Sequence, residues 1–369
     1  MTKLEQLIEE LCPNGVEYRK LSEVTTIERG RRVVKEQLSH DSGYPVFQNS
    51  LTPMGFHTDS NYPAETSYVI GAGAAGEIGY CKEDFWAADD CFPIVCGDSV
   101  INRYVYHFLL WQQPVLLSKV RKASIPRLSR SVIENIMIPV PPLPVQSEIV
   151  RILDNFTELT AELTAELTAR KKQYEYYRDF LFANAKDAVS ITLDKISENC
   201  DAQRKPVTSG KREAGDIPYY GASGIVDYVK DYIFDVDYLL VSEDGANLLA
   251  RNTPIAFSIS GKTWVNNHAH ILKFDEYDTR RYVEIYLNSI DLSYYITGGA
   301  QPKLNQKNLN KIEIPLPPLD EQKRIVAILD RFDTLCNDIS AGLPAEIEAR
   351  QKQYEYYRDK LLTFKELDK

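Results

Sequence analysis

One long stretch of this chain occurs twice, and that repeat restricts the possible folds more than any other feature. Ile138–Leu143 reads IPVPPL and returns as IPLPPL at Ile314–Leu319, an offset of 176 positions. QYEYYRD at Gln173–Asp179 returns unchanged at Gln353–Asp359, an offset of 180, so the second copy is longer by four residues between these marks. A repeat of this length predicts two copies of one structural plan in a single polypeptide.

The sequences before the two proline-rich segments correspond only weakly, so we expect two domains of equal architecture with different surfaces. A length of 369 residues agrees with two or three domains. The predicted divisions are a first variable domain with an N-terminal helix (1–140), a central helical segment (141–186), a second variable domain (187–316) and a C-terminal helical segment (317–369). Such a pair suggests two related tasks on two different targets.

Both variable domains contain short apolar runs bounded by turn residues, which is typical of strands, together with helical segments. The predicted fold class is α+β: two mixed α/β domains separated by long antiparallel coiled-coil helices, with an internal pseudo-twofold repeat. The expected strands are Ser67–Ile70, Phe92–Val95, Tyr238–Val241, Thr253–Ile259 and His270–Phe274, and the expected helices are Val100–Trp111 and Arg280–Ile290.

Apolar residues from Ile149 to Leu181 recur at alternating spacings of four and three, which is the pattern of a coiled-coil seam. Prolines at 141, 142 and 144 predict that the helix begins near Val145 and runs to about Leu181, roughly 55 Å at about 1.5 Å per residue. The second copy repeats the pattern from Ile325 to Ile339, and Gly342-Leu343-Pro344 predicts a break. We expect the two helical regions to pair antiparallel and to carry the variable domains to opposite ends; separate helical bundles are the alternative.

The first helix contains the tandem TAELTAEL, whose spacer positions are Thr160, Leu163, Thr164 and Leu167. Ala, Glu and Leu favour helix, so these residues could simply extend it. The alternative is length control, because four residues turn a helix by about 400° and lengthen it by about 6 Å. One DNA base pair turns the duplex by about 34–36°. The net rotation of about 40° nearly matches one base pair, so one unit could re-aim a distal domain by that step.

Two glycine-rich motifs raise the possibility of nucleotide binding. Gly71–Gly76 fits G-x-G-x-x-G, but a strand-like sequence follows it instead of the helix that would bind a pyrophosphate. Ala256–Thr263 fits a relaxed P-loop that ends in Lys262-Thr263, but its neighbours look like strands, so a hairpin turn at Ser260-Gly261-Lys262 is the better interpretation.

The sequence contains no G-x-S-x-G or H-E-x-x-H motif and no Asn-Pro-Pro-aromatic motif of a base methyltransferase, so no catalytic residue is expected. The six cysteines form no C-x-x-C pair, and His268-x-His270 has no identified third ligand, so no metal site is expected. No apolar run approaches the roughly 20 residues of a membrane span, and the N-terminus lacks a signal-peptide core. We expect a cytoplasmic protein without membrane contact.

Basic residues cluster within each variable domain, although the net charge of −10 excludes a uniformly basic surface. Phosphate contacts need local Lys and Arg, whereas Arg, Asn, Gln and Ser read base edges. A solvated charged face without function is the alternative for any single residue, but the clusters recur in both domains. The candidate DNA-binding residues are Arg29, Arg31, Arg32, Gln48, Asn49, Lys119, Arg121, Lys122 and Arg127 in the first domain, and Arg204, Lys205, Lys211, Arg212, Ser223, Lys262, Asn266, Asn267, Lys303 and Lys307 in the second.

The whole chain resembles the specificity subunit of type I restriction-modification enzymes. The resemblance rests on the twin I-P-x-P-P-L-x-x-Q and I-V-x-I-L-D stretches, the twin QYEYYRD, the TAEL tandem, and the patterns at Ile217–Gly224 and Ser242–Asn247. The tandem and the Gly342-Leu343-Pro344 break are similar to the subgroup in which the number of four-residue units sets the gap between two half-sites.

This resemblance implies a non-catalytic reader of double-stranded DNA with two target-recognition domains, each for one half of an asymmetric bipartite site. It implies two modification subunits, which bind S-adenosylmethionine and methylate adenine, and restriction subunits, which use ATP and Mg to translocate and cleave DNA. No cofactor is expected in this chain. Two roles stay open for the repeated tyrosines, contact with these partners or the helix seam: Tyr174, Tyr176, Tyr177, Tyr354, Tyr356 and Tyr357.

Two other classes of function compete with this interpretation. One is a nucleotide-binding enzyme that acts through Gly71–Gly76 or Lys262. The other is a coiled-coil scaffold that does not bind nucleic acid.

Overall fold

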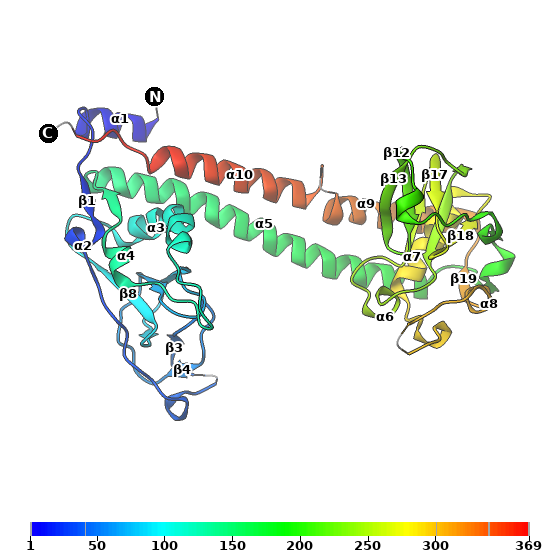
Figure 1. The fold of residues 1–369 in the computed structure, drawn as a ribbon, viewed down its shortest axis with the longest axis horizontal. Helices are drawn as coiled ribbons and strands as arrows, with labels where there is room; N and C mark the ends of the chain where they lie inside the picture. Colours follow the sequence, from blue (N-terminus) through cyan, green and yellow to red (C-terminus); the bar gives the residue numbers. More distant parts are fainter. Residues whose placement is uncertain (1, 41, 300, 339, 368–369) are drawn as a thin grey trace. The chain divides into compact units, whose positions relative to one another are not determined.

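Residue contacts divide the chain into two units. The structure, a computed structural model, describes residues 2–40, 42–299, 301–338 and 340–367. The first unit consists of Met1–Ala165 and Glu346–Lys369, and the second consists of Glu166–Ala345. Two helices have residues in both units: α5 (Leu143–Ala183), which continues for 41 residues without interruption, and α10 (Leu343–Leu361), whose first three residues belong to the second unit (Figure 1).

A four-stranded antiparallel sheet forms the centre of the first unit. Its strands, in spatial order, are β2 (Thr25–Ile27), β8 (Cys91–Cys96), β5 (Thr66–Ile70) and β6 (Ile78–Cys81). Helix α3 (Asn102–Ser118) packs on β5 and β6 and buries Tyr104, Phe108 and Leu109. A second sheet has the order β4 (Phe56–His57), β3 (Tyr44–Phe47), β7 (Trp86–Ala87), and β1 (Tyr18–Lys20) pairs with β9 (Met137–Pro139).

The second unit repeats this arrangement with different residues, and among the described residues its second sheet has four strands instead of three. Its central sheet has the order β11 (Glu198–Asn199), β18 (Ala269–Lys273), β15 (Tyr238–Ser242), β16 (Ala256–Ile259). Helix α7 (Tyr277–Ser289) packs on β15 and β16. The second sheet has the order β13 (Gly224–Val229), β12 (Ala214–Gly221), β17 (Lys262–Val265), β14 (Phe234–Asp235), and β10 (Val189–Thr192) pairs with β19 (Glu313–Leu316).

The shared strand order confirms the predicted α+β class and the internal repeat. Register supports it: Val46 lies beside Trp86 in a parallel pair of the first unit, as Tyr219 lies beside Trp264 in the second. The remaining short helices are α1 (Lys3–Leu11), α2 (Leu21–Val24), α4 (Arg130–Glu134), α6 (Asn247–Ala250) and α8 (Gln306–Leu309), with 3₁₀ turns at Lys35–Gln37, Leu193–Lys195, Asp201–Gln203, Ser209–Lys211 and Ser293–Tyr295.

All seven expected elements of the variable domains are present, although their bounds differ from those expected, as strand β16 and helix α3 show. Strand β16 begins at Ala256 rather than Thr253, because the Asn247 side chain bonds both the N–H and the carbonyl of Thr253 and holds that residue in a turn. Helix α3 continues to Ser118 past Pro114, where burial of Leu116 offsets the lost backbone hydrogen bond.

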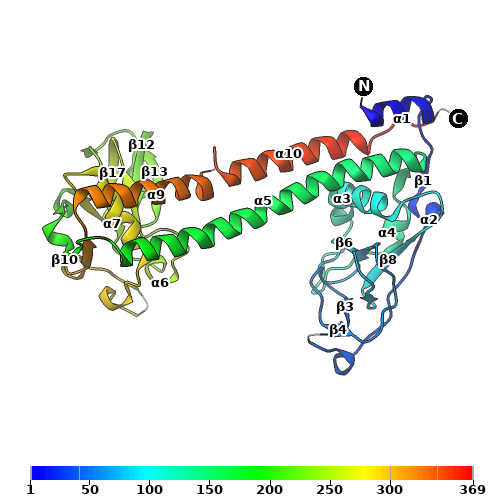
Figure 2. The same ribbon diagram turned by 180° about the vertical axis from the view of Figure 1, so that it is seen from behind.

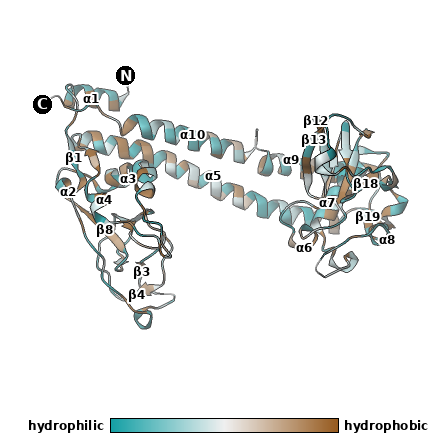
Figure 3. Cartoon of the chain, in the orientation of Figure 1, coloured by the Kyte–Doolittle hydropathy of each residue, from teal (hydrophilic) through white to brown (hydrophobic). Residues whose placement is uncertain are grey.

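The predicted seam of α5 is confirmed by burial at its alternating positions. Ile149 and Leu153 are fully buried, and Phe156, Leu163 and Leu167 are half-buried. Figure 3 shows hydrophobic and hydrophilic bands alternating along α5. The helix begins at Leu143, two residues earlier than expected, because Pro144 is tolerated in a first turn whose N–H groups have no helical partner.

Antiparallel pairing is confirmed separately in each unit. In the second, Phe332 of α9 (Leu319–Asn337) stacks on Tyr177 of α5 at 5.8 Å between ring centroids. In the first, Tyr357 of α10 (Leu343–Leu361) stacks on Phe156 at 5.3 Å, and α5 and α10 run side by side there (Figure 2). That this pairing carries the domains to opposite ends stays a prediction.

The expected break lies between α9 and α10. Helix α9 ends at Asn337, Gly342 N–H bonds the Asp338 carbonyl at 2.9 Å, and α10 starts at Leu343 with Pro344 in its first turn. Ile325, Leu329 and Cys336 of the second seam are buried, whereas the seam position Ile339 lies outside the described residues.

The repeated glutamine and aspartate join each variable domain to its long helix. Gln146 is fully buried and bonds Ile101 N–H and the carbonyls of Ser99 and Pro141. Its counterpart Gln322 bonds the Thr279 hydroxyl and the Pro317 carbonyl. Arg103 binds Asp154 at 2.7 Å in the first unit, and Arg281 binds Asp330 at 2.7 Å in the second. The residues of the repeated motif therefore fix each variable domain on its long helix.

Both chain ends belong to the first unit. Val16 and Glu366 form a parallel bridge, and the Tyr18 hydroxyl donates to the Phe364 carbonyl at 3.0 Å. The C-terminal segment therefore fastens the start of the first variable domain to the end of α10. No helix within the described residues is long and apolar enough to cross a membrane.

Candidate nucleic-acid interface

Neither glycine-rich motif has the backbone that phosphate binding requires. Gly71–Gly76 leads into β6 and Ser260-Gly261-Lys262 leads into β17, so neither opens a helix. The expected hairpin at Lys262 is wrong, because β16 and β17 belong to different sheets. Gly261, with φ of +67°, allows the chain to turn there, and the Lys262 ammonium lies 4.7 Å from the centre of the Tyr232 ring.

A crevice of about 400 Å³ lies beside the C-terminal end of β5, and we name it the first crevice. Arg29 and Arg127 both line it. Arg29 Nε donates to the Asp89 carbonyl at 2.9 Å, and Gln48 Nε2 donates to the Asp89 carboxylate at 3.2 Å. The structure thus brings two predicted DNA-binding residues, Arg29 and Gln48, onto one aspartate, and places a third, Arg127, in the wall of the same crevice.

The first crevice depends on a close contact between Gly71 and Phe92. A Cβ atom at Gly71 would lie 2.4 Å from the Phe92 ring, so only glycine fits without movement of that ring. The Gly71 carbonyl accepts from Leu128 N–H at 2.8 Å, and Ala72 bridges Arg127. The end of β5 thereby holds the segment that carries Arg127.

The second unit has a crevice, the second crevice, at the corresponding place beside β15, also of about 400 Å³. Its backbone frame repeats that of the first. The residue directly after β5 is Gly71, and the residue directly after β15 is Glu243. The carbonyl of each accepts from a leucine N–H at 2.8 Å, from Leu128 in the first unit and from Leu304 in the second. The N–H of each donates to a second loop, from Gly71 to the Asp90 carbonyl at 2.7 Å and from Glu243 to the His268 carbonyl at 2.9 Å.

The wall of the second crevice carries one pair of polar side chains, His268 and Asp244, that has no match in the first. His268 Nδ1 lies 2.9 Å from Asp244 Oδ2, where the first unit has Asp90 and Ala72. Lys303 takes the place of Arg127 in the corresponding backbone bridge and also lines the crevice.

Behind the second crevice lies a buried ionic network. Arg204 binds Glu243 at 2.6 Å, and Lys303 binds the other oxygen of Glu243 at 3.0 Å. His270 Nδ1 lies 2.6 Å from Asp201, and its Nε2 lies 2.7 Å from the Leu304 carbonyl. Burial acts to raise the pKa of the Glu243 carboxyl, but hydrogen bonds from Arg204 and Lys303 outweigh burial and hold that pKa below its usual value.

The sequence did not reveal that three potential metal ligands meet in this network. Ligand atoms of Asp201, Glu243 and His270 lie within 4.8 Å of one another. Two cationic side chains already bind these carboxylates, however, so the chain supplies the positive charge that a metal ion would bring. The arrangement fits an ion-pair network that supports the crevice wall.

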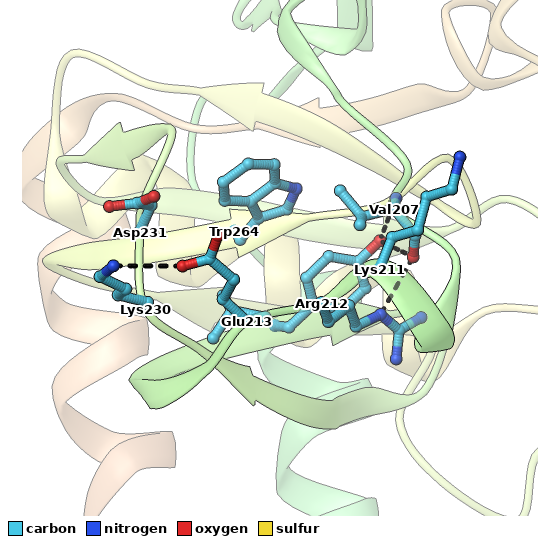
Figure 4. Close-up of a pocket in the computed structure, with 9 residues that line it drawn as sticks. Val207, Lys211, Arg212, Glu213, Lys230, Asp231 and Trp264 are labelled. Atoms are coloured by element: carbon cyan, nitrogen blue, oxygen red, sulfur yellow. Dashed lines mark hydrogen bonds and ion pairs between the residues drawn. The ribbon is translucent and has the colours of Figure 1, made fainter.

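A smaller cavity of about 130 Å³ lies near the second sheet of this unit (Figure 4). Lys211, Arg212, Tyr219 and Trp264 line it. Arg212 lies 4.3 Å above the Tyr219 ring and bonds the Val207 carbonyl at 3.0 Å. Figure 4 shows the Lys211 ammonium pointing away from these groups. Lys211 is therefore available to solvent, whereas Arg212 holds the local structure.

The other predicted contact residues fall into two groups. Arg204, Arg212 and Asn266 are engaged inside the second unit, where Asn266 Oδ1 accepts from His268 N–H at 2.8 Å. The remaining cations, apart from Arg29, Lys262 and Lys303, are exposed and make no ion pair with any described residue: Arg31, Arg32, Lys119, Arg121, Lys122, Arg127, Lys205, Lys211 and Lys307. Asn49, Ser223 and Asn267 are exposed as well.

Sequence reasoning missed the acidic partners in the crevices, Asp89, Asp244 and Glu243, and treated His268 as an ordinary histidine. The available signal was positional. Arg127 and Lys303 are related by the repeat offset of 176 positions, and two of the missed residues, Glu243 and Asp244, directly follow β15, where they pair with the segment that carries Lys303.

Comparison with known proteins identifies the family. The family model described as type I restriction modification DNA specificity domain matches the chain twice, over residues 13–170 and 186–349. The chain belongs to this family. One crevice lies in each matched segment, so the duplicated domain of the family corresponds to the duplicated fold.

Relatives of full length carry the same assignment. The chain is 34% identical to a putative type I restriction enzyme specificity subunit, S.HindORF215P, from Haemophilus influenzae, with 98% of both chains covered. It is 33% identical to the EcoR124I/EcoR124II specificity subunit of Escherichia coli, with 99% of this chain and 97% of the relative covered. Specificity subunits are the non-catalytic members of these systems, which agrees with the absence of catalytic motifs.

A solved structure supports the architecture. The crystal structure of a type I restriction-modification S subunit from M. genitalium matches with a TM-score of 0.68 at 17% identity, covering 94% of this chain and 96% of that one. At this identity the match concerns the fold, which the two chains share across nearly their whole length.

Proposed function

We propose that this chain is the specificity subunit of a type I restriction-modification complex, in which each unit reads one half of an asymmetric, bipartite sequence in double-stranded DNA. One observation carries the proposal: the same fold occurs twice, and its two corresponding crevices are lined by different exposed side chains. Two DNA-binding domains with one fold recognise different sequences when the residues that face the DNA groove differ. Residues 1–140 and 187–316 are then the target-recognition domains, and 141–186 and 317–369 are the helical spacers.

Exposed cations near each crevice supply the phosphate contacts in this proposal. Arg127 and Lys303 lie on corresponding bridges, so each domain places one cation at the same point of its crevice. Gln48 and Asn267 are suited to read base edges. Arg204, Arg212 and Asn266 act from inside by holding the loops. The proposed DNA-facing set is Arg29, Arg31, Arg32, Gln48, Asn49, Lys119, Arg121, Lys122, Arg127, Lys205, Lys211, Ser223, Lys262, Asn267, Lys303 and Lys307.

Two copies of a modification subunit fit the duplicated helical surface. Tyr174 and Tyr354 belong to the seam, but Tyr176 and Tyr356 are 65% and 64% exposed. The next tyrosine of each copy stacks across the helix pair, Tyr177 on Phe332 and Tyr357 on Phe156, and is 39% and 40% exposed respectively. The matching exposed tyrosines at 176 and 356 favour two docking sites for one kind of partner. The modification subunits would bind S-adenosylmethionine and methylate adenine, and restriction subunits would supply the ATP- and Mg-dependent steps.

The TAEL tandem is proposed as the element that sets the gap between half-sites. Leu163 and Leu167 occupy seam positions of α5, and the Thr164 hydroxyl donates to the Thr160 carbonyl at 2.8 Å, so the tandem lies within continuous helix. Deletion of Thr164–Leu167 should shorten the gap in the modified sequence by one base pair. Mapping modified bases in host DNA tests this, because an unchanged gap or altered half-sites would refute the spacer role.

Competition binding tests the main proposal. The chain assembled with its modification subunits should prefer one bipartite duplex over scrambled duplexes of equal length. The logarithm of its affinity should fall linearly with the logarithm of salt concentration. Sequence-indifferent binding would count against a specificity subunit, and salt-insensitive binding would count against the assigned phosphate contacts.

A further inference from the structure

The two crevices carry different side chains at one pair of corresponding wall positions. Asp244 and His268 occupy the second crevice where Ala72 and Asp90 occupy the first, although the backbone bonds around these positions are the same. Residues on a shared frame that differ in chemistry and reach solvent are the places where two readers can differ in the sequence they recognise.

The geometry leaves one ring nitrogen of His268 available. Asp244 engages Nδ1 with both oxygens, at 3.0 and 2.9 Å, and His268 N–H donates to Asn266 Oδ1 at 2.8 Å. The His268 side chain is 51% exposed, and no hydrogen bond joins its Nε2 to any described residue. A carboxylate that accepts from Nδ1–H selects the tautomer in which Nε2 is an acceptor.

We infer that His268 is a specificity-determining residue of the second domain, which accepts a hydrogen bond from the exocyclic amino group of an adenine or a cytosine through Nε2. Asp244 is its positioning residue, since it fixes the tautomer and the ring orientation. Lys303, which lines the same crevice, anchors the neighbouring phosphate. In the major groove only adenine and cytosine present amino donors, so such an acceptor discriminates against guanine and thymine at that position. The inference rests on the proposed function.

Two substitutions of His268 distinguish recognition of a base from structural support of the crevice. His268→Asn keeps an amide near the position of Nδ1, which can still donate to Asp244, but removes the atom at the Nε2 position. His268→Gln places an amide oxygen near Nε2. The experiment measures binding of the assembled complex to a duplex library in which each base of the wild-type site is varied singly.

With His268→Asn, discrimination should fall about tenfold or more at one position of one half-site, with the other half-site unchanged. With His268→Gln, a preference for an amino-bearing base should persist there. Unchanged discrimination in His268→Asn, or an equal loss of affinity for all sequences, would overturn the assignment and leave a structural His–Asp pair. If the wild-type complex shows no bipartite preference in this assay, the proposed function itself fails, so the two failures are distinguishable. Hydrogen exchange of β15 and β18 in each variant, compared with wild type, shows that the unit is folded.

Discussion

The two crevices have the same backbone arrangement, but different interactions stabilise it. In the first, Gly71 packs directly on the Phe92 ring, whereas in the second Glu243 takes the corresponding position and binds Arg204 and Lys303. One unit depends on close packing and the other on buried charge. The comparison teaches that one backbone arrangement tolerates either a glycine packed on a ring or an ion-paired glutamate at the same crevice position.

The contacts between each variable domain and its long helix, in contrast, use the same residue types in both units. Gln146 and Gln322 keep one role, as do the ion pairs of Arg103 and Arg281 with their aspartates. These residues lie in sequence that the two copies share. The residues that fix each domain on its helix are therefore repeated, whereas most residues that line the crevices differ between the units.

The largest effect should come from Glu243→Gln, which removes the charge between two cations. Glu243 is buried, with 12% of its side chain exposed, so loss of the pairing should lower the free energy of unfolding of the second unit by about 3 kcal/mol. Denaturant unfolding, with hydrogen exchange to localise the change, measures it. Because the pKa of Glu243 is lowered in the fold, its stabilisation is complete above pH 4.5 and is lost as the pH falls further, so the variant and the wild type should converge in acid.

Gly71→Ala is the matched test in the first unit. The added Cβ would meet the Phe92 ring at 2.4 Å, so displacement of that ring should cost about 1–3 kcal/mol. The same unfolding measurement should show no convergence with wild type in acid, since no charge is involved. A pH-dependent loss here would contradict the distinction between packed and ionic crevices.

Smaller differences are expected in DNA binding when each crevice cation is neutralised. Arg127→Gln should weaken binding to all sequences about equally and reduce the salt slope by about 1, because Arg127 has no ion-pair partner within the described residues. Lys303→Gln should reduce the slope less, since Glu243 already neutralises part of that charge. Equal slopes in both variants would show that the ion pair of Lys303 opens on binding.

The smallest effect concerns His107, which has Ile285 at the corresponding helical position in the second unit. Burial lowers the pKa of His107, although its hydrogen bond to Asp154 acts in the opposite direction. The unfolded chain then binds more protons, so the contribution of His107 to stability is complete above pH 6.5 and is lost as the pH falls below it. Thermal unfolding between pH 7.5 and 5.5 should show a slope that His107→Leu removes.

Much of the fold could be predicted because the repeat and the helical periodicity are visible within continuous segments of the sequence. The α5 seam from Ile149 to Leu181 follows from spacing alone. The ionic network could not be predicted, because Asp201, Glu243 and His270 meet only after β11, β15 and β18 pair. The basic clusters contain exposed cations such as Arg127 as well as internal ones such as Arg204, and only their partners in space separate the two kinds.

Exchange of one domain tests the central claim most directly. A chimera keeps both proline-rich segments and replaces residues 189–312 with the corresponding residues of another family member, and the modified sequence is then mapped in host DNA. Independent reading by the two units predicts that one half-site changes while the other half-site and the gap remain. A change in both half-sites, or a modified sequence that is not divided into two parts, would contradict it.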